Sequence, residues 1–134
     1  MANRSYLYSS NIIPGLFTTR TISLKGIGEY NYDIPLIYKV LMSGQPQPCF
    51  SLIWEEPDPT ALIADYTEGL ARLSQLLVEI TVPIAKPLIL QTLQFLNNEE
   101  NKSQYFFLEC EHVRPPCANA AHDTLHKFHQ KRYF

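Results

Sequence analysis

The sequence predicts an α+β fold, with three to four helices packed on a small sheet of short strands. Short aromatic or apolar runs of the kind that form strands alternate irregularly with longer segments of helical periodicity. No regular strand–helix–strand rhythm is present, so we do not expect a parallel sheet. The length of 134 residues and the 46% hydrophobic content are typical of one domain that buries its own core.

Four segments predict strands because they are rich in aromatic, β-branched or other apolar residues. In the segment at residues 49–55, the alternation of side chains along a strand places Phe50, Leu52 and Trp54 on one face. The predicted strands cover residues 4–9, 18–26, 49–55 and 104–110.

Residues 32–44 predict a first helix. Asp33 is placed to cap it, Pro35 stands at its start, and Gly44 suits a left-handed end. The two glycines in residues 26–33 predict a turn before this helix, since the third glycine of a dinucleotide-binding loop is missing.

A second, longer helix is predicted to begin after Asp58, with Pro59 at its first position. Its apolar residues step by three or four, which gives one continuous stripe. We also expect helices at residues 87–96 and 119–128. The stripe of the long helix consists of Leu62, Tyr66, Leu70, Leu73, Leu77 and Ile80.

Charge and hydropathy exclude some classes of protein. The net charge of −2 argues against a protein that binds nucleic acid by neutralising phosphates. The most apolar stretch, residues 76–90, is interrupted by charges and prolines, so no membrane span is predicted. Because the first ten residues contain no apolar run, we do not expect a secretory signal there. Cys49, Cys110 and Cys117 lack a tight disulfide spacing, and free thiols suit the cytoplasm, where we expect the protein.

The first half of the chain resembles a family of uncharacterised bacterial proteins, over about residues 3–55. These proteins begin with an Asn-Arg-Ser-Tyr-Leu segment and carry an Asp-Ile-Pro block followed by Leu-Met-Ser-Gly. The resemblance implies no particular activity and transfers no catalytic residue. The matching residues are Asn3, Arg4, Ser5, Tyr6, Leu7, Glu29, Tyr30, Asp33, Ile34, Pro35, Tyr38, Leu41, Met42, Ser43 and Gly44.

The composition changes near the C-terminus. Residues 1–110 carry seven Lys and Arg against eleven Asp and Glu, whereas residues 111–134 carry four against two and all four histidines. We therefore expect a single α+β domain over residues 1–110 and a separate tail over residues 111–134. The resembled family runs longer than this chain, so we interpret the tail as a replaced C-terminus outside the family's fold.

The tail carries a candidate zinc site. His122 and His126 lie one turn apart on the predicted helix, so both imidazoles can face one ion. The spacing is unlike that of a zinc finger, in which a close cysteine pair precedes the histidines by about twelve residues. A solvated helix rich in histidine is the favoured interpretation. The candidate ligands are Cys110, Cys117, His122 and His126.

The same segment contains the residue types of a Cys–His enzyme. Cys117 is a candidate nucleophile, with His122 or His126 as the base and Asp123 nearby. Nearness in sequence is weak support, because such sites are assembled across a fold. We therefore expect no enzyme.

An acidic corner is the candidate partner-binding surface. Its carboxylates suit a basic partner, and Trp54 and Tyr66 are candidate aromatic anchors. The structural alternative is a helix N-terminus that acids stabilise through the helix dipole. The candidate residues are Trp54, Glu55, Glu56, Asp58, Asp65 and Glu68.

These observations favour a non-catalytic cytoplasmic protein-binding module. Its specific form is an immunity-type protein that neutralises a bacterial toxin, with a basic toxin domain as partner and without a cofactor. A homodimer is compatible with the sequence. The alternatives are a zinc protein or Cys–His enzyme that uses the tail, and a truncated family member with a mainly structural role.

Overall fold

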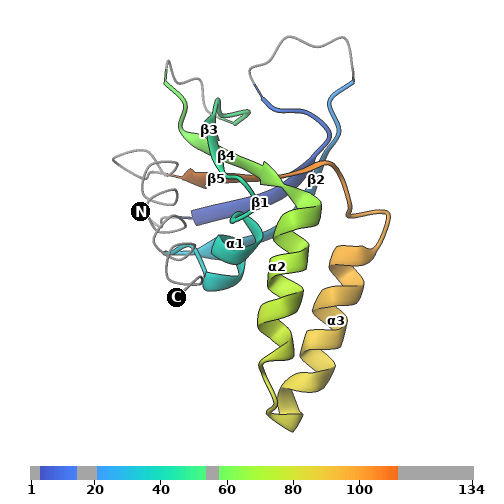
Figure 1. The fold of residues 1–134 in the computed structure, drawn as a ribbon. Coiled ribbons are helices and arrows are strands. Elements are labelled where there is room, and N and C mark those ends of the chain that lie inside the picture. The colour runs from blue at the N-terminus through green and yellow to red at the C-terminus, as the bar shows by residue number, and fades with distance from the viewer. Residues whose placement is uncertain (1–3, 15–20, 54–57, 112–134) are drawn as a thin grey trace.

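The computed structural model describes residues 4–14, 21–53 and 58–111, which form an antiparallel sheet with helices on one face (Figure 1). The strands are β1 (Arg4–Ser10), β2 (Leu24–Asn31), β3 (Gln47–Cys49), β4 (Ala61–Asp65) and β5 (Tyr105–Glu111). Their order across the sheet is β2-β1-β5-β4-β3. The helices are α1 (Leu36–Leu41), α2 (Tyr66–Val78) and α3 (Lys86–Asn97), and the 3-10 turn η1 (Pro83–Ala85) precedes α3.

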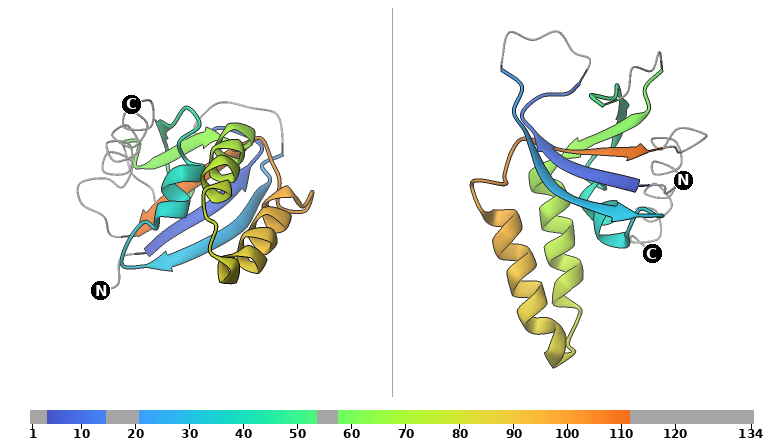
Figure 2. Two further views of the ribbon diagram at one scale, coloured as in Figure 1. Left: turned by 60° about the horizontal axis from the view of Figure 1, so that its bottom comes forward. Right: turned by 180° about the vertical axis from the view of Figure 1, so that it is seen from behind.

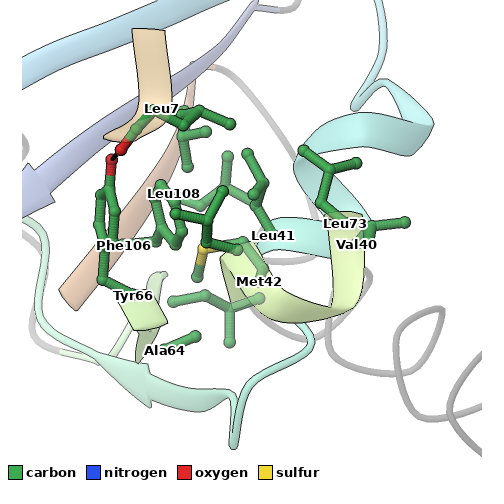
Figure 3. Packing of buried hydrophobic residues seen from close by; sticks show 12 residues of the cluster. Leu7, Val40, Leu41, Met42, Ala64, Tyr66, Leu73, Phe106 and Leu108 are labelled. Carbon is green, nitrogen blue, oxygen red and sulfur yellow. Dashed lines mark hydrogen bonds between the residues drawn. The ribbon is translucent and has the colours of Figure 1, made fainter. Parts of the chain in front are cut away.

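The main core lies between the sheet and the helices (Figure 3). Leu7 from β1 and Phe106 from β5 are fully buried beneath α1 and α2. The ring of Tyr66 stacks on Phe106 with the centroids 4.0 Å apart, and its hydroxyl donates a 2.7 Å hydrogen bond to the Leu96 carbonyl oxygen. This bond ties the start of α2 to the end of α3.

Helices α1 and α2 approach each other closely at Gly69. A methyl group at this position would overlap the carbonyl oxygen of Leu41 and lie 2.9 Å from its carbonyl carbon. Glycine costs about 1 kcal/mol relative to alanine in a helix interior, so the contact between the two backbones explains its presence.

The opposite face of the sheet carries no helix in the described chain (Figure 2). A smaller apolar cluster forms there around Phe107 on β5, Ile63 on β4 and Cys49 on β3. Tyr8 on β1 packs against this cluster, with its ring centroid 6.1 Å from that of Phe107.

The fold confirms an α+β class, and the described part of the chain contains three α-helices. The predicted strands at residues 4–9 and 104–110 are confirmed as β1 and β5. The predicted strand at residues 49–55 is wrong, because β3 ends at Cys49 and Phe50 lies outside it.

The position predicted for the second strand is also wrong. β2 begins six residues later than the predicted segment 18–26 and includes most of residues 26–33, where the glycines predict a turn. Gly28 serves packing instead, since a methyl group there would lie only 2.6 Å from the Tyr38 hydroxyl.

The predicted start of the long helix is wrong. Asp58 and Pro59 do not begin it, because residues 61–65 form β4 and α2 starts at Tyr66. Because β4 is buried on both faces, its sequence is a continuous apolar run. Such a run lacks the alternation of apolar and polar residues that would distinguish a strand from a helix. The N-cap is Asp65.

The first helix is shorter than the predicted segment 32–44. Pro35 occupies its N-cap, and Asp33 instead accepts a 2.7 Å hydrogen bond from the Ile34 amide. Gln45 (φ 56°), and not Gly44, adopts the left-handed conformation after the helix.

The predicted helix at residues 87–96 is confirmed as α3. The predicted helix at residues 119–128 lies outside the described residues. The division of the chain into a domain at 1–110 and a tail at 111–134 stays a prediction.

Candidate functional site

The acidic corner is only partly described, and two of its carboxylates have structural partners. Asp65 caps α2 by accepting a 2.8 Å hydrogen bond from the Glu68 amide. Glu68 pairs with Arg72 at 2.9 Å and accepts a 3.2 Å hydrogen bond from Gln45. Asp58 is exposed. The candidates Trp54, Glu55 and Glu56 lie outside the described residues.

Of the candidate zinc ligands, the structure describes Cys110 alone. Its sulfur is in a disulfide, and a disulfide sulfur is not the thiolate that zinc binds. Cys117 lies outside the described residues. His122 and His126 lie outside the described residues. The described residues contain no group of three or more metal-ligating side chains.

A buried carboxylate lies on the helix-free face of the sheet. Glu109 is 1% exposed, and it accepts hydrogen bonds from the Ser51 side chain and from the amides of Leu52 and Ile53. Its Oε2 has no hydrogen-bond partner among the described residues. Burial raises the pKa of Glu109, and the three hydrogen bonds oppose this shift. Glu109 therefore attaches the segment after β3 to the centre of the sheet.

Two neighbours of Glu109 are shifted toward their neutral forms. Burial, reinforced by the charge of Glu109, raises the pKa of the Cys49 thiol to about 12. Burial and the same charge raise the pKa of Tyr8. A nucleophilic cysteine needs a lowered pKa, so Cys49 is a structural thiol.

The most exposed apolar surface is on the hairpin that α2 and α3 form. The two helices run side by side and extend beyond the sheet (Figures 1 and 2). The buried residues of α2 lie in its first eight positions. In α3 the buried residue is Leu96, next to the last residue of the helix. The end of the hairpin distant from the sheet therefore lies outside the main core.

Large apolar side chains cover this distal end. Ile84 is 81% exposed and Val78 is 74% exposed, and four further exposed apolar residues lie between positions 80 and 90. Exposed apolar side chains that gather in one part of a molecule mark a candidate site of interaction. The surface, named here the apolar tip, consists of Val78, Ile80, Val82, Ile84, Leu88 and Leu90.

The apolar tip is electrically neutral. Glu79 and Lys86 are the charged residues between positions 78 and 97. Both are exposed, and neither forms an ion pair within the part of the chain that the structure describes. No helix among the described residues is long and apolar enough to cross a membrane.

The chain belongs to a protein family described as a domain of unknown function (DUF7822), which matches residues 11–132. The match includes most of the segment after residue 110, so the interpretation of that segment as sequence foreign to the family is wrong. The match begins after the Asn-Arg-Ser-Tyr-Leu segment, and a bacterial origin stays a prediction. No curated protein and no solved structure matched the chain.

Sequence reasoning missed both the apolar tip and Glu109. The tip has a sequence signal, because residues 78–90 carry apolar side chains without the polar face of a surface helix. Glu109 has no such signal, since it lies near the end of an apolar strand, where a solvated carboxylate is the ordinary expectation.

Proposed function

We propose that this chain is a non-catalytic protein-binding module whose contact surface is the apolar tip. The supporting observation is the exposure of six large apolar side chains on the part of the hairpin that extends beyond the sheet. Covering each of them with a partner's apolar surface is favourable by about 1 to 3 kcal/mol, in proportion to the area buried.

The proposed surface differs from the acidic corner. Asp65 and Glu68 already have partners within the chain, which reduces the charge available to attract a basic protein. Binding of a bacterial toxin remains the specific form of the proposal. In that form, the partner protein is toxic when expressed without this chain.

The exposed tip also fits the alternative of a truncated family member, whose missing part would cover it. The zinc and Cys–His alternatives stay predictions, and both require sulfur in the reduced state. A cytoplasmic location also stays a prediction, although the disulfide at Cys110 counts against it because the cytosol keeps thiols reduced.

Comparative affinity purification from the native host tests the proposal. The full chain, the variant Ile84→Asp and the variant Leu36→Asp would be compared, because Leu36 is a similarly apolar residue, 58% exposed, on α1. We expect one stoichiometric protein with the wild type and with Leu36→Asp, and its loss with Ile84→Asp. Recovery of the same proteins with all three chains would contradict the proposal.

A further inference from the structure

The charges beside the apolar tip restrict the kind of partner that fits it. Glu79 is the C-cap that follows α2 and Lys86 begins α3, so one charge of each sign lies beside the connection between the helices. A strongly basic or acidic partner gains little attraction from a surface whose charges cancel. A partner that offers apolar side chains with one basic and one acidic group beside them is complementary to it.

A second copy of this chain has that arrangement. In a two-fold interface, residue i of one copy contacts residue j of the other, and the reverse contact occurs as well. The exposed Glu79 of one copy can then face the partner's Lys86, and the exposed Lys86 can face the partner's Glu79. Both charges are without an ion pair among the described residues of a single chain.

The shape of the molecule permits this contact. The α2–α3 hairpin extends away from the sheet, so two hairpins can meet while the two sheets stay apart (Figure 2). Two hairpins side by side form a four-helix arrangement, in which apolar side chains of facing helices cover one another.

We propose that the apolar tip binds the apolar tip of a second copy, about a two-fold axis that pairs each Glu79 with the partner's Lys86. This inference rests on the proposed function, because it names the occupant of the same surface. It makes the chain a homodimer whose contact is separate from both faces of the sheet.

Sedimentation velocity of the full chain, from low to high micromolar concentration, tests the inference. We expect the mass of two chains for the wild type and for Leu36→Asp, and the mass of one chain for Ile84→Asp. Ile84 is exposed, so its substitution leaves the core intact, and an unchanged circular dichroism melt verifies this.

A charge exchange tests the pairing itself. Glu79→Lys or Lys86→Glu alone places two like charges opposite each other at both of the symmetry-related contacts between positions 79 and 86. We expect the dissociation constant of the dimer to rise about 2- to 30-fold. The double variant should recover the wild-type dissociation constant. Failure of the double variant to recover it would overturn the pairing.

The remaining outcomes separate this inference from the proposed function. A wild-type chain that stays monomeric at every concentration overturns the homodimer. If the wild-type chain instead captures a different stoichiometric protein from the native host and Ile84→Asp does not, the tip binds that protein and the proposed function is supported. Monomers that sediment with lipid vesicles would assign the tip to a membrane surface and overturn both.

Discussion

Replacing Gly69 with alanine should weaken the contact between α1 and α2. The added methyl would meet the backbone of Leu41, which cannot rotate away as a side chain does. Overpacking of this kind costs about 1 to 3 kcal/mol or more, and helix propensity returns about 1 kcal/mol. Because the obstacle is backbone, we take the upper part of the range and expect a net loss of about 2 kcal/mol.

Urea denaturation of the full chain measures this loss. With a slope of about 2 kcal/mol/M for a small domain, the midpoint for Gly69→Ala should fall by about 1 M. Gly26→Ala is the matched control, since a methyl there meets nothing within 4 Å and should change stability by less than about 0.5 kcal/mol. A Gly69→Ala chain as stable as the wild type would refute the close approach of the two helices.

Three further predictions concern single side chains. Asp65→Ala should lose about 1 kcal/mol in urea denaturation through the missing N-cap, and Asp58→Ala should change little; equal losses would contradict the start of α2. Burial raises the pKa of the Glu109 carboxyl above 4.5, so the folded chain binds a proton at Glu109 more tightly than the unfolded chain does. The free energy of unfolding should therefore fall as the pH rises from below 4.5 through the raised pKa. Glu109→Gln should remove that part of the fall, and identical pH profiles of the urea midpoints would count against burial of the charge. With a pKa of about 12, Cys49 should be alkylated about a thousandfold more slowly in the folded chain than in urea, and equal rates by peptide mass spectrometry would show an accessible thiol.

Segments with one strong local pattern were predictable from sequence. Residues 104–110 read as a strand because of their consecutive aromatic and apolar residues, and they form the strand β5 beside β1. The long helix was correct in type and wrong in its start. Leu62 fits the helical spacing to Tyr66 by coincidence, whereas burial on both faces places it in β4. The Asp65-Tyr-Thr-Glu68 sequence was the better N-cap signal, since Asp65 does accept from the Glu68 amide.

The candidate site could not be predicted from sequence, because the exposure of its residues is set by contacts between segments that are distant along the chain. Asp65 and Glu68 look like free acids in sequence, but a helix cap and the pair with Arg72 occupy them. Leu77 and Ile80 extend the predicted stripe toward the tip, yet Leu77 packs partly against the core and Ile80 is exposed. How far a helix continues beyond its sheet decides which part of a stripe is core and which part is surface.

Site-specific photo-cross-linking in living cells tests most directly whether the apolar tip is a protein contact. A photoreactive amino acid would replace Ile84 in one full-length chain and Leu36 in another. We expect a cross-linked product of defined mass from position 84, and the homodimer predicts that its mass is that of two chains. Equal cross-linking from both positions, or products from position 36 alone, would contradict the assignment of the binding surface to the tip.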